Sequence, residues 1–374
     1  IRQLGLGYLV FPAAEHSRFS HALGALELGQ RVLNNLREKD TTISNQEYEG
    51  TLIALLLHDV GHGPLSHTLE HSLLSEFNHE MMSLAIMHEL NNQFDGALNT
   101  AIEIFTDQHP KKFLHQLVSS QLDLDRLDYL KRDSFFTGVS EGSVGIQRIL
   151  KTMRVHKGNI VIERKGIYAI ENYIISRRLM YMQVYLHKTV LSADSLIRSI
   201  FNRVSYLFAE GEPLPSGSAQ LDYFLREQPS AEKHISSSVI EAYAQLDDYD
   251  VYQSIKAWQN SKDPILSDLS HRFLNRNLFH ASFFDKKPGK STHQKIHELT
   301  RNYLDKNGLP NDDGSMKYYI RTEYSTSEAY KYKNDSIWIL DNEVAIEFSK
   351  AADTKSIIAL TEPVKKYFII HPKY

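Results

Sequence analysis

The sequence contains no cysteine among its 374 residues. This absence excludes a disulfide framework, a thiolate metal site and a cysteine nucleophile, and it agrees with a cytoplasmic location. No segment approaches eighteen uninterrupted apolar residues, so we expect no membrane-spanning helix. The formal net charge is -4 at pH 7. With no basic excess to neutralise phosphates along a duplex, we expect no dedicated nucleic-acid partner.

Two common nucleotide-binding motifs are also absent. The sequence has no GxxxxGK[ST] loop of the kind that cradles phosphates in the P-loop proteins. The stretch Gly5-Leu6-Gly7 has no third glycine and does not lie between a strand and a helix, so it does not indicate a dinucleotide site. Any nucleotide chemistry must therefore depend on another arrangement of residues.

The spacing of apolar residues predicts a mostly α-helical fold. From about residue 20 to 210, apolar residues recur at intervals of three and four, as on one face of a helix. The expected helices cover residues 21–36, 48–61, 79–90, 113–134 and 168–204. A short strand pair is expected at 153–163, with its turn at Gly158-Asn159.

The residue pattern of the second half of the chain changes at two places. Residues 209–220 are rich in Gly, Pro and Ser, which indicates a loop or a seam between subdomains. After weaker helical patterns, short β-type runs appear at 336–340, 344–349 and 366–372. We therefore predict a helical domain at 1–210 that carries the candidate site, a helical extension at 211–310, and a small α/β C-terminal lobe at 311–374.

Histidine is unusually frequent, with 18 residues, and four acidic or imidazole side chains lie in the segment HDVGHGPLSH at 58–67. The segment follows an apolar run that reads as a buried helix, and Gly61, Gly63 and Pro64 end that helix. His58 and Asp59 therefore stand at the end of a buried helix. Burying a carboxylate there without compensation is costly, and a metal ion would compensate it.

Two other segments can supply further ligands. HSRFSH at 16–21 contains His16 and His21, and LDLDRLDYLKRD at 122–133 contains four aspartates, of which Asp125 and Asp128 share one helix face. Imidazole and carboxylate ligands without sulfur suit Mn, Fe, Ni, Zn, Co or Mg rather than a structural zinc site. The sequence therefore predicts one divalent metal without naming it.

The ordered segments HSRFSH, HDVGHGPLSH, NHE (78–80) and LDLDRLDYLKRD resemble those of the HD-domain phosphohydrolases. The closest likeness is to the branch of dNTP triphosphohydrolases that includes the SAM-and-HD-domain enzymes, and it covers about the first 210 residues. The resemblance implies an HD-domain helical fold and the release of inorganic triphosphate from a dNTP by attack on the α-phosphate. It makes the metal ligands His21, His58, Asp59 and Asp125. We interpret Asp123 and Asp128 as ordinary solvated helix-face acids, with a role in holding the fold as the alternative for Asp128.

The resemblance also implies roles for residues around the substrate. It places His62, His67, Glu70 and His79 around the scissile phosphate, with Glu70 at a position where the dNTP hydrolases carry Asp. The implied substrate-binding residues are Gln3, Arg18, Arg126, Tyr129, Asp133, Arg177 and Tyr185. The candidate residues for a regulatory nucleotide between subunits are Arg154, Lys165, His187 and Lys188, although Glu163 stands where the family carries an arginine.

Three functions remain open from the sequence. The first is a dNTP triphosphohydrolase that assembles as a homo-oligomer, a dimer or a tetramer. The second is a phosphomonoesterase or phosphodiesterase of the same fold acting on another nucleotide, because the pocket and not the metal set selects the substrate. The third is a nucleotide-binding regulator without turnover, which only the Glu70 replacement favours.

Overall fold

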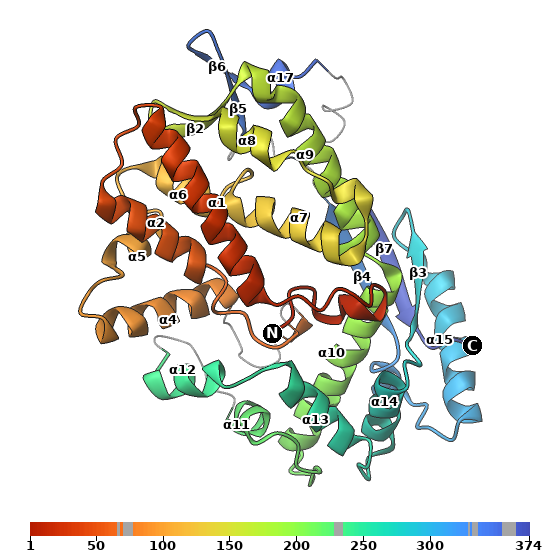
Figure 1. Ribbon diagram of the computed structural model, residues 1–374. Coiled ribbons are helices and arrows are strands. Elements are labelled where there is room, and N and C mark those ends of the chain that lie inside the picture. Colours follow the sequence, from red (N-terminus) through yellow and green to blue (C-terminus); the bar gives the residue numbers. More distant parts are fainter. Residues whose placement is uncertain (66–67, 70–77, 228–234, 328–329, 331–335, 354–363) are drawn as a thin grey trace.

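The computed structural model describes residues 1–65, 68–69, 78–227, 235–327, 330, 336–353 and 364–374. The described chain is mostly helical, which confirms the predicted fold class (Figure 1). The helices that surround the candidate site are α1 (Arg18–Glu38), α2 (Asn45–Leu57), α4 (His79–Gln93), α5 (Asn99–Phe105), α6 (Lys112–Val118) and α7 (Leu124–Thr137). In Figure 1, α1 and α7 run through the middle of the molecule, and the N-terminus lies near its centre.

The remaining helices extend the fold on both sides of this group. They are α8 (Ile146–Thr152), α9 (Ile167–Met180), α10 (Lys188–Ala209), α11 (Ala219–Glu227), α12 (Ser237–Ala244), α13 (Asp248–Trp258), α14 (Pro264–Leu274), α15 (Lys290–Lys306), α16 (Asp313–Met316) and α17 (Phe348–Ala351). The helical part also contains one π-helical segment, η5 (Tyr181–Tyr185). Three short 3₁₀ segments are η1 (Gly5–Leu9), η3 (Ser140–Gly142) and η4 (Arg164–Gly166).

Local capping explains where the site helices begin. Ser17 caps α1 by accepting the backbone N–H of Ser20 at 3.2 Å, and Ser44 and Glu47 form a capping box at the start of α2. Asp123 caps α7, so the helix expected at 113–134 is two helices, α6 and α7. An N-cap residue has non-helical dihedral angles, and Asp123 therefore interrupts a helical pattern that looks continuous in the sequence.

The helix expected at 168–204 is also divided. The π-helical segment η5 follows α9, and His187 then leaves the helical conformation and accepts the N–H of Thr189 at 3.2 Å to start α10. Single π turns inside helices are rare and often lie at functional sites. The interruption places Tyr185 and His187 at the junction of two helices.

Two small sheets accompany the helices. One has the order β1-β2-β5-β6 and the other has the order β3-β7-β4. Their strands are β1 (Met153–His156), β2 (Asn159–Glu163), β3 (His280–Phe284), β4 (Arg321–Ser327), β5 (Trp338–Asp341), β6 (Val344–Glu347) and β7 (Val364–His371). The expected hairpin at 153–163 is present, but its two-residue turn is Lys157-Gly158. Both turn residues have positive φ, +49° and +81°, as this tight hairpin turn requires.

The strands after residue 311 contribute to both sheets. β5 pairs in parallel with β2, with Ile162 opposite Ile339, while β7 lies between β3 and β4. Each sheet thus joins C-terminal strands to a strand from earlier in the chain. The division at 210 and 310 stays a prediction, and the sheets cross both of its boundaries.

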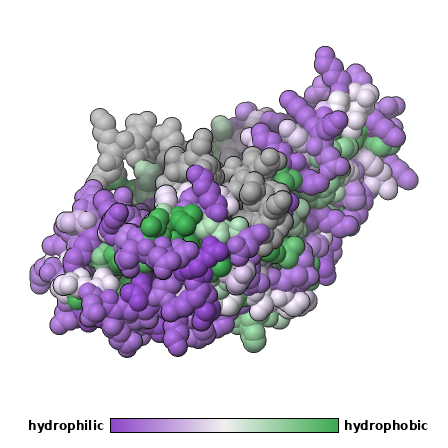
Figure 2. Space-filling model, turned by 90° about the horizontal axis from the view of Figure 1, so that it is seen from above, coloured by the Kyte–Doolittle hydropathy of each residue, from purple (hydrophilic) through white to green (hydrophobic). Residues whose placement is uncertain are grey.

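The buried apolar side chains form two clusters. One is built around α10, α13 and α14 and contains Phe201 and Trp258, and the other is built around α1, α2, α7 and α9 and contains Leu33 and Tyr173. Among the described residues, no helix combines the length and apolar character needed to span a membrane. The face seen in Figure 2 is mainly hydrophilic, with hydrophobic residues in small patches.

Candidate metal centre and substrate pocket

Three predicted metal ligands lie together in the structure. His21 in the first turn of α1, His58 at the C-terminus of α2 and Asp125 in the first turn of α7 place one ligand atom each within 4.8 Å of the other two. The Nε2 atom of His21 is 3.0 Å from Asp125 Oδ1, and that of His58 is 3.4 Å from the same oxygen. The segments are distant in sequence and meet because α1 packs against both α2 and α7.

The hydrogen bonds of the two histidines hold Nδ1 of each ring against the protein and leave Nε2 facing the cluster, where that of His21 contacts Asp125. His58 donates its Nδ1–H to the carbonyl of Leu55 at 2.7 Å, and its buried Nε2 has no hydrogen-bond partner among the described residues. His21 donates its Nδ1–H to Asp128 Oδ2 at 2.8 Å. Such contacts on the far ring nitrogen fix the tautomer and orientation of metal-binding histidines. The orphaned nitrogen of His58 is therefore aimed where a metal would bind.

Asp128 supports His21 rather than facing solvent. It is buried, and Arg132 one turn further along α7 holds its two oxygens at 2.8 Å each. Gly24 on α1 gives room for this pair, because a Cβ atom there would lie 2.0 Å from Asp128 Oδ1. The interpretation of Asp128 as an ordinary solvated acid is thus wrong, and the alternative, a role in holding the fold, agrees with these contacts, since α1 and α7 cross at this point. Asp123 is no solvated acid either, because it is buried and caps α7.

The electrostatics of the cluster also favour a cation. Burial opposes protonation of His21, but hydrogen bonds with Asp125 and Asp128 outweigh it and raise the pKa of His21 to about 10. Burial also opposes protonation of His58, yet the negative charges of Asp59 and Asp125 raise its pKa to about 9. The carboxylates therefore draw positive charge onto both rings, and a divalent cation can supply that charge in place of the protons.

Asp59, the fourth predicted ligand, lies beside the cluster. Its Oδ1 is 3.5 Å from His58 Nε2 and its Oδ2 is 3.9 Å from His21 Nε2. Arg18 donates from Nη1 to the same Oδ2 at 2.6 Å. Asp59 thus connects the metal cluster to a cation from the first turn of α1, and its assignment as a ligand stays a prediction.

The histidines predicted for the phosphate lie partly within the described structure. His62 is buried and stacks on His79, with ring centroids 3.9 Å apart, and its Nε2 is 3.4 Å from Asp59 Oδ1. Burial, outweighing the attraction of Asp59, lowers the pKa of His62 to about 3, so this ring is neutral at pH 7. His67 and Glu70 lie outside the described residues.

Several predicted substrate residues share a pocket of about 170 Å³ next to the metal cluster. Gln3, Arg18 and Tyr185 line it, together with apolar and backbone groups of Leu4 to Gly7. The buried Oε1 atom of Gln3 has no hydrogen-bond partner in the described part of the chain. Since Arg18 also contacts Asp59, the pocket and the metal cluster are joined through one side chain.

Asp133 anchors the aromatic side of this pocket. Its Oδ2 accepts a hydrogen bond from Tyr185 at 2.7 Å, and its Oδ1 is 2.7 Å from His16 Nε2. His16 is buried and stacks on Phe136 with centroids 4.5 Å apart. Tyr129 stands between the two parts of the site, since its ring centroid is 6.3 Å from that of His21 and 6.1 Å from that of Tyr185.

The two other candidate phosphate ligands differ in their surroundings. Arg126 is held by Asp123 and by the carbonyl of Ser120, so its positive charge is partly satisfied within the protein. Arg177 is buried, and its Nε and Nη1 atoms have no hydrogen-bond partner among the described residues. A buried guanidinium with free donors is the more suitable group for an anionic ligand.

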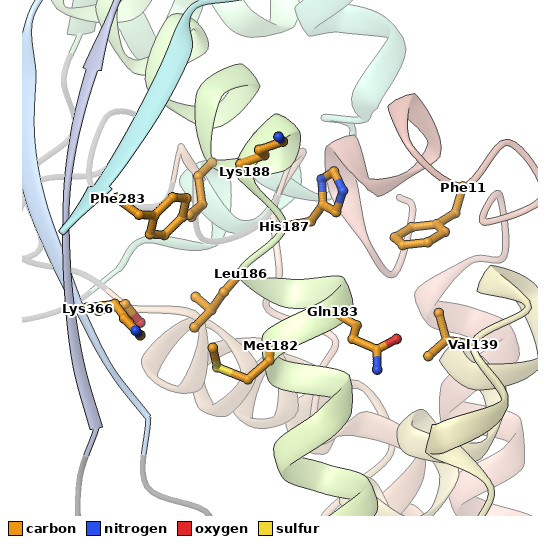
Figure 3. Close-up of a pocket in the computed structure, with 11 residues that line it drawn as sticks. Phe11, Val139, Met182, Gln183, Leu186, His187, Lys188, Phe283 and Lys366 are labelled. Carbon is orange, nitrogen blue, oxygen red and sulfur yellow. The ribbon is translucent and has the colours of Figure 1, made fainter. Parts of the chain in front are cut away.

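The four candidate regulatory residues are separated into two places. His187 and Lys188 line a pocket of about 590 Å³, which Figure 3 shows between the η5–α10 junction and the strands that carry Phe283 and Lys366. Arg154 and Lys165 do not line this pocket. Both contact Glu163 at 2.5 Å, so the acid that replaces an expected arginine pairs with each of them.

Sequence reasoning assigned no role to several residues that the structure connects to the site. They are His16, Asp128, Arg132, Asp194 and Asp248. His16 and Asp128 lie within the motifs discussed above, and their spacing was a signal that could have been used. Asp194 lines the substrate pocket and Asp248 reaches Leu65, but both lie outside the motifs and carry no local signal.

Comparison with known proteins agrees with this geometry. The HD-domain model matches residues 18–133, and the model of an HD-associated region matches residues 144–209. The crystal structure of a phosphohydrolase from Bacteroides thetaiotaomicron is 40% identical with a TM-score of 0.93, covering 100% of this chain and 92% of that one. An uncharacterised protein from Bacillus subtilis is 35% identical over 306 residues, 80% of this chain and 68% of the relative.

A more distant relative carries a more specific name. The deoxynucleoside triphosphate triphosphohydrolase of Bos taurus is 27% identical over 329 residues, 75% of this chain and 52% of the relative. Together with the site geometry, the nearer similarities show that the chain belongs to the HD-domain phosphohydrolases. Membership implies a divalent metal, and the residues present fit one: two imidazole nitrogens and a carboxylate oxygen converge, one nitrogen without a partner.

Replacing Asp128 by alanine is expected to weaken metal binding about 10- to 100-fold, the usual effect of removing a carboxylate that orients a ligand histidine. The measurement is metal affinity by competition with a chromophoric chelator. Glu27→Ala is the matched control, because Glu27 pairs with Arg31 at the same four-residue spacing but is exposed. Equal affinities of the Asp128 variant and the wild type would show that His21 needs no orienting partner.

Proposed function

We propose that the protein is a metal-dependent dNTP triphosphohydrolase that converts a dNTP to a deoxynucleoside and inorganic triphosphate. The proposal is supported above all by one observation: Gln3, Arg18 and Tyr185 line a single pocket that Arg18 joins to the metal cluster. Amide and carboxylate groups at the sugar end and guanidinium groups at the metal end suit a substrate with a sugar at one end and phosphates at the other.

The metal would be Mn, Fe, Ni, Zn, Co or Mg, and its ligands would be His21, His58, Asp59 and Asp125. When bound, such an ion lowers the pKa of water and neutralises charge on the phosphate under attack. Hydrolysis breaks the bond between the α-phosphorus and the sugar O5′, and the leaving O5′ takes up a proton. We assign proton handling and phosphate contact to His62, His67, Glu70 and His79.

The remaining residues would bind and orient the substrate. We assign Arg18, Arg126 and Arg177 to the phosphate oxygens, where permanently charged donors spread the negative charge of the transition state. Gln3 and Asp133 would hold the sugar 3′-hydroxyl. Tyr129 and Tyr185 would close the space at the 2′ position and so disfavour ribonucleotides. Tyr185 suits this role because its hydroxyl is already held by Asp133.

The decisive experiment is a panel of dNTPs and NTPs with Mn, Mg, Fe, Co, Ni and Zn supplied in turn. Release of tripolyphosphate from dNTPs alone is the expected result, with products resolved by ion-exchange chromatography. Orthophosphate or a nucleoside monophosphate as the product would instead indicate a phosphomonoesterase or a phosphodiesterase of the same fold. Nucleotide binding with no product under any metal would indicate a regulator without turnover.

We further propose that a second nucleotide binds at His187 and Lys188 between subunits of a homo-oligomer, a dimer or a tetramer. The pocket of Figure 3 supports this because it combines His187, Lys188 and Lys366 with apolar side chains. Arg154 and Lys165 are the weaker part of this proposal, since Glu163 already pairs with both. Repeating the panel with a second nucleotide present, alongside light scattering for the oligomeric state, tests it.

A further inference from the structure

A single buried carboxylate outside the HD motifs connects two parts of the site. Asp248 is the first residue of α13 and is 3% exposed. Its Oδ1 accepts the backbone N–H of Leu65 at 3.0 Å, and its Oδ2 accepts that of Arg2 at 2.8 Å. The guanidinium of Arg2 is 3.7 Å from the same carboxylate. Asp248 thus bridges the loop that follows α2 and the N-terminal segment that carries Gln3.

We call residues 58–65 the HD loop, because it begins with His58 and Asp59 and includes His62. A second residue of the helical extension holds its middle. Tyr243, on α12, donates its hydroxyl to the carbonyl of Gly61 at 3.0 Å. Its ring lies over Gly63, where a Cβ atom would be 2.5 Å from the Tyr243 hydroxyl oxygen. The extension therefore contacts the HD loop on the C-terminal side of the metal ligands, at two backbone groups.

The HD loop needs such support because its own backbone is strained at this end. Leu65 has a φ of +51°, a conformation that residues with a side chain rarely adopt. Its side chain is buried, and a buried N–H without an acceptor is destabilising. The carboxylate of Asp248 offers an acceptor to Leu65 and another to Arg2 at the same time. An asparagine in this place offers only one acceptor oxygen.

Contacts on the next turn of α13 reinforce the connection. Tyr252 lies four residues after Asp248, and its hydroxyl forms a hydrogen bond with that of Tyr8 in η1. Arg2 lies over the ring of Tyr8 at 5.1 Å. The N-terminal segment is thus held to α13 on both sides of Gln3, while the HD loop is held to the same helix through Leu65.

We infer that Asp248 is a positioning residue, which sets the HD loop and the N-terminal segment at the correct separation for substrate by holding the backbone of Leu65 and Arg2. Its hydrogen bonds to the described residues go to backbone groups and not to the metal ligands, and one of these partners, Leu65, lines the substrate pocket. The inference rests on the proposed function only in assigning Gln3 and His62 to the substrate. The connection that Asp248 makes between the HD loop and the N-terminal segment affects any reaction at this HD-domain site, whatever its substrate.

The test compares Asp248→Asn with Asp263→Asn. Asp263 is a matched control in the same extension, because it caps α14 and pairs through both oxygens with Arg203, at 3.0 and 2.6 Å, with no contact to the HD loop. Amide hydrogen exchange of peptides covering residues 1–9 and 58–65 is measured by mass spectrometry. Asp248→Asn is expected to speed exchange in one or both segments about tenfold or more, the effect of losing a charged acceptor, and Asp263→Asn to leave both unchanged.

Turnover and metal content distinguish positioning from a general loss of structure. Turnover is measured with two substrates, a dNTP and bis(p-nitrophenyl) phosphate, which has neither sugar nor base. In Asp248→Asn, kcat/KM is expected to fall about 10- to 100-fold for both substrates, while the metal content stays at the wild-type level. The loss should be larger for the dNTP, because only that substrate reaches Gln3. Asp248→Glu, which restores two acceptor oxygens, should recover part of it. Tyr243→Phe removes a single hydroxyl and serves as a milder variant should Asp248→Asn fail to fold.

Three outcomes would overturn the inference. Unchanged exchange and kcat/KM in Asp248→Asn would show that the two hydrogen bonds position nothing. If Asp263→Asn and Asp248→Asn have the same melting temperature and lose kcat/KM by the same factor, the loss is a general effect of lower stability. If Asp248→Asn loses metal as well as activity, Asp248 acts on the metal cluster and not on the separation of the two segments. If the wild type hydrolyses no dNTP, the proposed function fails, whereas hydrogen exchange and the diester assay still decide the role of Asp248.

Discussion

Replacing His58 by alanine is expected to abolish stoichiometric metal binding and to reduce hydrolysis about a thousandfold or more, since a catalytic metal supplies several kcal/mol of transition-state stabilisation. His58 is the ligand whose Nε2 has no hydrogen-bond partner among the described residues, which leaves this atom for the ion. Removing His58 also leaves the half-buried carboxylates of Asp59 and Asp125 with one imidazole neighbour fewer. Metal content by plasma mass spectrometry and turnover on the same preparation measure both effects.

His88→Ala is the control for this experiment. His88 is exposed on α4 and belongs to neither the metal cluster nor the substrate pocket. It should keep wild-type metal content and turnover. Full metal occupancy in His58→Ala would contradict the ligand assignment. Full activity without metal would contradict metal-dependent hydrolysis as such, so the two ideas can fail separately.

Replacing Gly61 by alanine is the second change with a large expected effect, because the HD loop packs on the backbone of α4 at this glycine. A Cβ atom there would lie 2.2 Å from the backbone nitrogen of Ser83 and 2.3 Å from the carbonyl oxygen of His79. Neither backbone atom can move as the end of a flexible side chain can. The Gly61 N–H also donates to Ser83 Oγ at 2.9 Å, and that hydroxyl donates to the carbonyl of His58.

The added methyl group should therefore lower the free energy of unfolding by about 1–3 kcal/mol or more and move the HD loop away from α4. Because Asp59 and His62 lie on this loop, turnover should fall well beyond what the stability change explains. Chemical denaturation and initial rates measure the two quantities. Gly289→Ala is the control, since no atom of the described residues lies within 4 Å of a Cβ atom there. Wild-type kcat in folded Gly61→Ala would show that the loop tolerates displacement.

The metal half of the site could be predicted from local patterns. An apolar helix that ends in His58 and Asp59 before a glycine indicates buried ionisable groups, and buried charge requires compensation. The resemblance to the HD-domain phosphohydrolases then supplied His21 and Asp125, and the structure brings both to His58. The mostly helical fold followed from the spacing of apolar residues, which depends only on neighbours in the chain.

Local patterns were less reliable where a side chain competes with the helix. The apolar period continues through 113–134 and through 168–204, yet Asp123 and His187 each turn a side chain onto the backbone and begin a new helix. Whether such a cap forms depends on surrounding contacts. For Asp123 these include Arg126, which pairs with the same carboxylate. The periodicity of apolar residues carries no information about this competition.

The sequence by itself determined the helical class of this protein, its metal-binding residue types and the absence of a thiolate ligand, because these follow from composition and short spacing. Only the tertiary structure decided which acids support the site. Asp128 orients His21 because α1 and α7 cross at Gly24, and Asp133 meets His16 across 117 residues. Asp248 reaches Leu65 across 183 residues. Such contacts arise from the packing of distant elements, which no local pattern can bring together.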